Sequence, residues 1–396
     1  MVLVNQEFLH SVTHELANIL NYWKTNTIDK KHGGYLGRID HFNQVIDKSS
    51  KGIILNSRIL WTFSAASNHY QNDAYKVECI TAYQYLQSCF RDNNNGGVYW
   101  KVNYLGEPLE TKKQTYAQAF TIYSLAEYYK YCNKKEVLEW AFDLFELVEE
   151  KTKDQEFDGY IEAFEKNWGS LQDMRLSDKD LNAPKTMNTH LHILEAYTTL
   201  FEVTNNSKVE KALKALIDLF LDQFVSENNH FKLFFSKDWK NLSHETSFGH
   251  DIEAAWLLLN ASKQLNDLSY IKKTEILALK IVDTFLEEAI DQDFGVFNAI
   301  NQKTNKLDFD KHWWPQAEAI VGLLYVWEIT NDKKYLAIAN KVWAFIERYI
   351  IDFDNGEWYF RVDRHGVSYQ NENKVGPWKC PYHNTRACIE MIRKLK

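Results

Sequence analysis

The chain has 396 residues and a formal net charge of −8, and its 46 Lys and Arg residues are scattered rather than clustered. This distribution gives no sign of a nucleic-acid surface, and no segment approaches the run of about 18 apolar residues that a membrane span requires. Aromatic residues make up 15% of the chain, a surplus that fits a carbohydrate cleft as well as a packed core.

The N-terminal segment and the cysteines indicate where the protein works. The first 20 residues lack the basic stretch and the uninterrupted apolar run of a signal peptide. The five cysteines show no CxxC spacing and fit a reducing compartment. We therefore expect a cytoplasmic protein without nucleic-acid or membrane partners, either a monomer or a weak homodimer.

Apolar residues recur with helical periodicity in twelve segments, and only five prolines interrupt the chain. In chain order the segments are residues 6–22, 52–68, 73–90, 113–131, 136–152, 186–203, 207–225, 248–266, 270–289, 314–330, 333–351 and 382–395. The sequence therefore predicts twelve helices, arranged as six pairs.

A short aromatic-rich run of alternating polarity follows the first helix of every pair. The runs start at Gly33, Gly96, Asp158, Asn229, Phe294 and Asn355, spaced by 63, 62, 71, 65 and 61 residues. Runs of this kind with turn residues predict β-hairpins, and the regular period indicates a repeat architecture.

Six helix–hairpin–helix units that close on themselves make an all-α (α/α)6 toroid. The even-numbered helices would form the inner ring, and the hairpins would gather on one face. An open solenoid is the alternative, but it needs polar capping repeats, and the segment 382–395 resembles a full repeat. No linker breaks the period, so we expect residues 1–396 to form a single domain.

Polar and aromatic residues gather near the start of each even-numbered segment, where a central pocket is expected. They are Arg58, Tyr116, Asn188, His192, His250, Glu253, Trp313, Trp314, Glu318, Trp378, His383 and Arg386. Taken singly, each has an ordinary explanation as a core residue or an ion-pair partner. Three histidines at equivalent repeat positions (His192, His250 and His383) favour a functional site.

The residue spacing disfavours metal and nucleotide chemistry. His190 and His192 are two residues apart, so on a helix they point to different sides. No HExxH motif, cysteine cluster or glycine-rich phosphate loop is present in the sequence. We expect no metal and no other cofactor. The alternative is a metal site to which three separate helices supply one histidine each.

The histidines suit one chemistry and the carboxylates another. Histidine has an unperturbed pKa of about 6.5, so two rings on different helices can remove a proton next to a carbonyl and return it to the other face. Arg58, Asn188 or the third histidine would stabilise the enediolate. A glycoside hydrolase needs two carboxylates, for which Glu253 and Glu318 are candidates. A non-catalytic sugar-binding ring is the third interpretation.

Several long strings resemble cellobiose 2-epimerases, which belong to the N-acylglucosamine 2-epimerase superfamily. The strings are GGYLGRID, ILNSRILWTFSA, KTMNTHLHILEAYT, FGHDIEAAWLL, WWPQAEA and WKCPYHNTRACIE. The resemblance extends over residues 8–393, and it implies the (α/α)6 barrel. It also implies that the reducing-end glucose of a β-1,4-linked disaccharide, such as cellobiose or lactose, is converted to mannose without a metal or nucleotide.

The resemblance implies a role for each candidate residue. His250 and His383 would exchange the proton at carbon 2, and His192 would assist ring opening. The substrate oxygens of carbons 1 to 3 would be held by Arg58 and Asn188. The reducing-end subsite would be lined by Tyr116, Glu253, Trp313 and Trp378. Glu318 would support a catalytic histidine.

The substrate itself stays open at this point. A free-monosaccharide mannose/glucose 2-epimerase shares much of the same site. The loop of residues 167–183 is a candidate lid, and its length bears on whether a second sugar fits.

Overall fold

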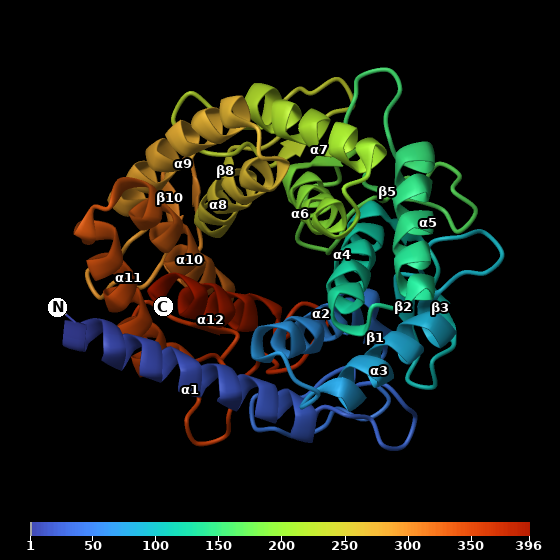
Figure 1. The fold of residues 1–396 in the computed structure, drawn as a ribbon, viewed down its shortest axis with the longest axis horizontal. Coiled ribbons are helices and arrows are strands. Elements are labelled where there is room, and N and C mark those ends of the chain that lie inside the picture. Colours follow the sequence, from blue (N-terminus) through green and yellow to red (C-terminus); the bar gives the residue numbers. More distant parts are fainter. Residues whose placement is uncertain (1) are drawn as a thin grey trace.

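The computed structural model describes residues 2–396, with side chains described from Gln6 onward. Within this range, twelve α-helices form two concentric rings (Figure 1). They are α1 (Val2–Asn26), α2 (Ile53–Tyr70), α3 (Lys76–Tyr85), α4 (Thr115–Cys132), α5 (Lys135–Lys151), α6 (Met187–Thr204), α7 (Ser207–Leu219), α8 (Phe248–Leu265), α9 (Leu268–Glu288), α10 (Trp313–Thr330), α11 (Lys333–Phe345) and α12 (Tyr382–Leu395). None of these helices is long and apolar enough to cross a membrane.

The predicted helices are confirmed, with small differences at their ends. Three outer helices continue into a π-helical turn before the chain leaves the helix. These turns are η1 (Leu86–Phe90), η2 (Phe220–Phe224) and η3 (Ile346–Ile350). The predicted segments 73–90, 207–225 and 333–351 therefore each cover a helix together with its π-helical turn.

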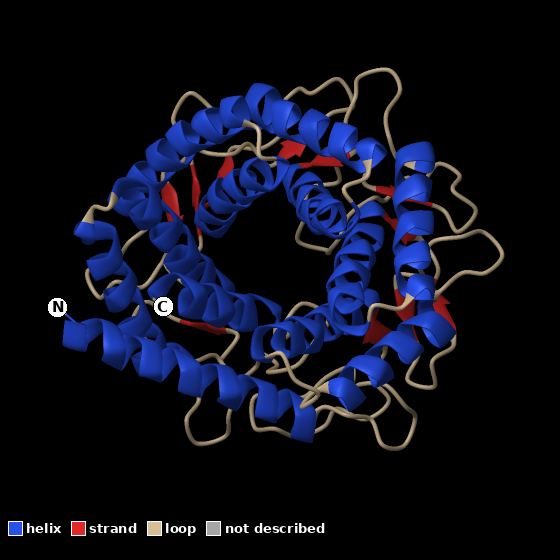
Figure 2. Cartoon of the chain, in the orientation of Figure 1, coloured by secondary structure: helices blue, strands red, loops and turns tan. Residues whose placement is uncertain are grey.

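The even-numbered helices form the inner ring, as predicted. Each packs against the next even-numbered helix, and α12 packs against α2, so that the ring closes (Figure 2). The inner helices are buried on nearly all sides; in α4 every residue from Thr115 to Tyr128 is buried. The outer helices bury only one stripe, as is usual for amphipathic surface helices. The fold is an (α/α)6 barrel.

The first helix and the last repeat complete the outer wall. The indole of Trp23 in α1 donates a hydrogen bond to Glu357 at 2.7 Å, and the indole of Trp358 donates one to Glu15 in α1 at 2.8 Å. Near these bonds, Ile39 forms an antiparallel bridge with Val375. The open solenoid is therefore wrong, because both ends of the chain are joined.

Twelve short strands lie on one face of the barrel, where the hairpins were predicted. They are β1 (Lys51–Gly52), β2 (Lys101–Val102), β3 (Pro108–Glu110), β4 (Lys113–Gln114), β5 (Ala163–Phe164), β6 (Lys185–Thr186), β7 (Phe234–Phe235), β8 (Glu245–Ser247), β9 (Ala299–Asn301), β10 (Lys306–Asp308), β11 (Lys311–His312) and β12 (Arg361–Val362).

The predicted hairpins are present, and the strands also pair between repeats, which the sequence analysis did not predict. Each repeat holds an antiparallel bridge of its own, such as Ile28 with Tyr35 and Val225 with Phe231. Only β2–β3 and β9–β10 pair as hairpin ladders within a repeat. The strand just before each of five inner helices instead pairs with the next repeat: β1 with β2, β4 with β5, β6 with β7, β8 with β9 and β11 with β12. An isolated two-stranded hairpin is marginal in water, and pairing between repeats gives these short strands a second partner.

A buried lysine–aspartate ion pair joins the two helices within five of the six repeats. In four of them, the lysine lies two residues before the inner helix. The pairs are Lys51–Asp29 (2.7 Å), Lys113–Asp92 (2.8 Å), Lys185–Asp154 (2.8 Å), Lys311–Asp291 (2.9 Å) and Lys374–Asp352 (2.5 Å). In the fourth repeat the equivalent positions are Ser226 and Thr246. These ion pairs, which we call the joints of the repeats, fix where the inner helix begins and therefore where the side chains of its first turns point.

Candidate active site

A cavity of about 440 Å³ lies at the N-terminal end of the inner helices. Nine of the ten predicted site residues line it: Arg58, Tyr116, Asn188, His192, His250, Glu253, Trp313, Trp378 and His383. The tenth, Glu318, lies behind His383 and binds its ring. The structure therefore brings together all ten residues in one place.

The repeat explains why these side chains meet. Arg58, His192 and Glu253 are each the sixth residue of their inner helix, and Glu318 is the sixth residue of α10. Residues at the same position of equivalent helices point toward the same centre. The sixth residues thus form one layer of the site, and residues from the first turn form the layer above it. The expectation that the three histidines share one repeat position is therefore wrong, because His192 is the sixth residue of α6, whereas His250 is the third of α8 and His383 the second of α12.

His190 points elsewhere, as its spacing from His192 predicted. It is the fourth residue of α6, and its Nε2 accepts the backbone N–H of Tyr160 at 2.9 Å. Burial lowers the pKa of His190 to about 3. At the fourth position of α4, Gln118 likewise accepts the N–H of Val98 at 2.8 Å. This position fastens a hairpin loop to its inner helix, so His190 has a structural role.

His383 is held by a carboxylate. Its Nδ1 lies 2.7 Å from Oε1 of Glu318. A carboxylate accepts hydrogen bonds, so Nδ1 carries the proton and the lone pair of Nε2 is free. Burial, followed by the nearby Arg58 and Arg386, lowers the pKa of His383 well below its usual value. The ring is therefore neutral near pH 7 and has the form of a general base.

His250 is held by a hydroxyl instead. Its Nδ1 lies 2.8 Å from Oγ of Ser247, and burial lowers its pKa to about 3. Trp314 lies between the two histidines, with its ring centroid 4.9 Å from that of His250 and 5.6 Å from that of His383. Gly249 permits this arrangement, because a Cβ there would lie 2.4 Å from the Trp314 ring.

Arg58 is a buried cation without a carboxylate partner in the described part of the chain. Its Nη2 donates to the hydroxyl of Tyr116 at 2.8 Å, and its guanidinium lies 4.2 Å from the centroid of the Phe120 ring. The side chain is only 3% exposed. A buried positive charge held by neutral groups is available to stabilise an anion that forms in the cavity.

His192 is positioned from below the cavity. Its Nδ1 lies 2.9 Å from Oε2 of Glu195, and its ring meets the ring of Tyr116 edge-on at 5.0 Å. Burial raises the pKa of Glu195, but Arg386 and His192 outweigh it and lower that pKa to about 2. Glu195 is therefore a carboxylate at neutral pH, and His192, like His383, has an anionic partner.

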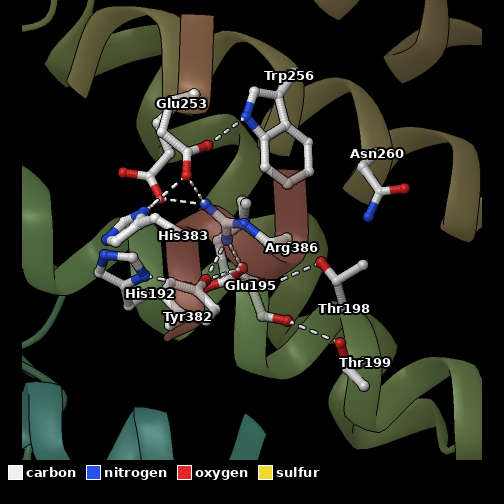
Figure 3. Close-up of polar contacts among 12 residues, drawn as sticks. His192, Glu195, Thr198, Thr199, Glu253, Trp256, Asn260, Tyr382, His383 and Arg386 are labelled. Carbon is white, nitrogen blue, oxygen red and sulfur yellow. Dashed lines mark hydrogen bonds and ion pairs between the residues drawn. The ribbon is translucent and has the colours of Figure 1, made fainter. Parts of the chain in front are cut away.

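Arg386 lies beneath the residues that line the cavity, in a layer that we call the floor, where it joins three carboxylates (Figure 3). Its Nη2 donates to Glu253 at 2.5 Å and to Glu318 at 2.7 Å, and its Nη1 donates to Glu195. Burial and the neighbouring Glu318 nevertheless raise the pKa of Glu253 to about 7. Glu253 can therefore both accept and donate a proton near neutral pH.

One group of possible metal ligands lies in this floor. Single ligand atoms of Glu253, Glu318 and His383 all lie within 4.8 Å of one another. The guanidinium of Arg386 already bonds both carboxylates, so a metal ion there would face an adjacent fixed positive charge. The donor set is satisfied by the arginine and does not fit a metal site.

The cavity also contains residues that the sequence analysis did not select. His312 and Phe360 line it, together with the loop residues Leu176 to Asp180. The lone indication for His312 was its place beside Trp313. The loop residues belong to the segment 167–183 that was predicted as a lid. Ser247 and Glu195 had no signal, because a serine before a helix and a glutamate within one are common.

Comparison with known proteins places the chain in a family. The profile of the N-acylglucosamine 2-epimerase (GlcNAc 2-epimerase) family matches residues 34–387. The chain belongs to this family. It is 40% identical to a cellobiose 2-epimerase of Bacteroides fragilis, over 98% of this chain and 99% of that one.

Solved structures and a more distant relative agree with this. The structure of a cellobiose 2-epimerase from Bacillus thermoamylovorans superposes with a TM-score of 0.92 at 35% identity, covering 98% of this chain and 99% of that one. A D-mannose isomerase of Marinomonas mediterranea is 24% identical over 92% of both chains. The resemblance to the cellobiose 2-epimerase members of the family is thus confirmed over nearly the full length.

Proposed function

We propose that this chain is a 2-epimerase that interconverts glucose and mannose at the reducing end of β-1,4-linked disaccharides such as cellobiose and lactose. One observation carries the mechanism: His250 and His383 come from different inner helices and both contact Trp314 in the same cavity. Full-length similarity to cellobiose 2-epimerases supports the substrate.

The reaction begins with opening of the sugar ring. Glu253, whose pKa is raised to about 7, and His192 move the proton between the anomeric hydroxyl and the ring oxygen. Opening produces the aldehyde that acidifies the hydrogen at carbon 2. Asn188 lines the cavity, and its Oδ1 is buried without a hydrogen-bond partner among the described residues, so it is available to accept a substrate hydroxyl.

One neutral histidine removes the carbon 2 proton and becomes charged, and the other, which must carry an extra proton when the step begins, donates that proton to the opposite face and becomes neutral. The electron pair passes to the aldehyde oxygen and forms an enediolate, which Arg58 stabilises. In the reverse direction the two histidines exchange roles. The neutral form of His383, with its free Nε2, is ready to act as the base. Trp313, Trp378 and Tyr116 line the subsite around the reacting sugar.

A second cavity of about 460 Å³ adjoins the first and favours a disaccharide over a free monosaccharide. The two cavities share Leu176, Trp378 and Phe360, so a sugar linked at oxygen 4 has room to extend outward. The loop between them is fastened by Gln114, whose side chain donates to the carbonyl of Arg175 at 2.9 Å. We propose that residues 167–183 act as a lid over this second sugar.

The glycoside hydrolase alternative receives no support from the geometry. Glu253 and Glu318 both bond the same Nη2 of Arg386, with carboxylate oxygens within 4.8 Å of each other. Hydrolases place their carboxylates on two sides of the scissile bond, about 5 to 9.5 Å apart.

We further propose that the enzyme works as one catalytic domain in the cytoplasm, without a metal ion.

Incubation with cellobiose in heavy water tests this function. We expect deuterium at carbon 2 and formation of glucosyl-mannose, both of which disappear in His250→Ala and His383→Ala while the helical circular dichroism is retained. The absence of exchange with cellobiose, lactose and mannose would contradict the proposal. Exchange with mannose alone would favour the monosaccharide alternative.

A further inference from the structure

A further cavity, separate from the two described above, lies at the other end of the barrel. We call it the far cavity; it has a volume of about 350 Å³ and is lined by the C-terminal halves of the inner helices. Arg386 and Glu195 line the far cavity and also belong to the floor beneath the catalytic pocket. Figure 3 shows His192 and His383 on one side of Arg386, with Thr198, Thr199 and Asn260 on the other.

Every cation that lines the far cavity is bound by at least one carboxylate. Lys130 lies 3.1 Å from Glu127 and 2.6 Å from Glu202. Arg393 lies 2.7 Å from Glu390, and Arg386 is bound by the three carboxylates of the floor. Carboxylates outnumber the cations in this lining, and no cation is left to bind an anion, so the chemistry disfavours an anionic ligand and is compatible with a neutral one.

Two aromatic pairs face this space from opposite sides of the inner ring. Trp61 of α2 and Tyr123 of α4 lie 5.4 Å apart by ring centroids, and Trp256 of α8 and Tyr325 of α10 lie 5.3 Å apart. Helices α2 and α4 stand across the ring from α8 and α10 (Figure 1). Aromatic faces pack against the C–H faces of a sugar ring, while its hydroxyls need polar neighbours at the edge.

Polar groups of that kind are present, although the Thr198 hydroxyl already donates to the carbonyl of Leu194 and Asn260 accepts a long bond from Tyr325. The lining includes Thr198, Asn260 and Gln264. The buried indole N–H of Trp61 and the buried Nε–H of Arg386 have no hydrogen-bond partner among the described residues. Unpaired buried donors are costly, so two of them on the walls of one cavity point to a ligand that accepts hydrogen bonds.

We propose that the far cavity binds one neutral, ring-shaped polyol of hexose size, such as glucose or mannose. An occupant would touch Glu195, Arg386 and Trp256. Glu195 holds His192 at 2.9 Å, and Trp256 donates to Glu318, which holds His383, at 3.0 Å. Binding would therefore alter how the histidines are positioned. This effect on turnover rests on the proposed epimerase function, whereas binding itself does not.

Calorimetric titration with D-glucose tests the proposal, using two variants of the far cavity and one of the catalytic pocket. Ala65 is 6% exposed and lines the far cavity, so Ala65→Phe fills it; Asn260→Ala removes a polar partner without adding bulk. Trp378→Ala is the matched change in the catalytic pocket. Circular dichroism confirms that each variant is folded.

We expect wild-type protein to bind glucose at the far cavity, and Asn260→Ala to weaken this binding by about 10-fold, as the loss of one buried hydrogen bond would. Ala65→Phe should abolish it, and Trp378→Ala should retain it. Glucose should also change kcat for cellobiose in wild type and not in Ala65→Phe.

Glucose binding that is unchanged in both far-cavity variants, or that Trp378→Ala alone removes, would overturn the proposal. If glucose binds at the far cavity but no sugar is epimerised, the proposed function fails and the site stands. Asn260→Ala keeps the test valid if Ala65→Phe does not fold.

Discussion

Nδ1 of His383 lies 2.7 Å from a carboxylate oxygen of Glu318, and this carboxylate fixes which ring nitrogen of His383 carries the proton. The equivalent nitrogen of His250 faces the hydroxyl of Ser247 at 2.8 Å. A hydroxyl both donates and accepts, so His250 can adopt either tautomer. The two histidines are therefore unequal, although both lie in the first turn of an inner helix.

Replacing Glu318 by Gln should lower kcat strongly, because the amide can hold His383 in the wrong tautomer and cannot stabilise its protonated form. In a catalytic triad the comparable change costs about 10⁴-fold, and we expect a loss of at least about 10²-fold here. KM for cellobiose should change little, since Glu318 does not line the cavity. A kcat within twofold of wild type would refute the role of Glu318.

Replacing Ser247 by Ala should have a smaller effect. The change removes one neutral hydrogen bond to His250, which contributes about 1 kcal/mol, so we expect kcat to fall by about 10-fold. The pH–rate profile should shift as well, because the ring loses its only side-chain partner at Nδ1 among the described residues. Ser88→Ala, on an exposed outer surface, is the control. Equal profiles in both variants would count against the assignment.

Replacing Arg58 by Lys should lower kcat/KM by about 10²- to 10³-fold, the usual loss when a donor to a developing oxyanion is removed. Lysine keeps the charge, but it cannot reproduce the planar guanidinium that lies against Phe120 and bonds Tyr116. Steady-state kinetics with cellobiose measures this loss. Near-wild-type activity would show that any positive charge suffices at this position.

Replacing Asp92 by Asn should lower the free energy of unfolding by about 3 to 5 kcal/mol, because it leaves the fully buried Lys113 charge unpaired. Glu139→Gln provides the matched control, since its ion pair with Lys135 is exposed and contributes little. Urea titration of both variants tests the difference. Equal midpoints would mean that the buried joints do not stabilise the ring.

Stability should fall steeply in acid. Burial alone would raise the pKa of Asp29, Asp92, Asp154, Asp291 and Asp352, but bonds from lysine and from loop N–H groups outweigh it and hold each pKa below its usual value. The stabilisation is present above about pH 4, the unfolded value, and is lost as the pH falls through the lower native values.

Three other buried carboxyls change the free energy of unfolding in the opposite direction, over a higher pH range. Burial raises the pKa of Glu15, Glu162 and Glu253 to about 7, so each favours the folded state below about pH 4 and loses that contribution as the pH rises toward 7. Below pH 4 these groups are protonated in both states and the aspartates decide the slope. Thermal unfolding followed from pH 7 to 2 checks this; a constant melting temperature below pH 4 would contradict it.

The ring and the identity of its inner helices could be predicted because they depend on periodicity. Arg58, His192, Glu253 and Glu318 share one helix position, and that shared position is visible in the sequence. Glu318 was predicted to support a catalytic histidine, but the partners of His192 and His250 were not singled out. Glu195 and Ser247 each lie three residues from their histidine, and a glutamate or serine at such a place is too common to be a signal. The strand pairing was also missed in part, since β1 and β2 are only two residues each and belong to different repeats.

The fourth repeat differs from the others in a way that matters in acid. Protonation of the aspartates will release the joints of the other five repeats, whereas Ser226 and Thr246 carry no charge to lose. Next to His250, Asp251 bonds His230 at 2.8 Å, and the pKa of His230 is raised by that carboxylate against the effect of burial. This contact gains strength as His230 becomes charged, and it is lost once Asp251 is protonated, because burial raises the pKa of the Asp251 carboxyl. A protein transferred to acid should therefore lose the ion pair beside His250 at a higher pH than the lysine–aspartate pairs of the other five repeats, whose carboxyl pKa values are lowered.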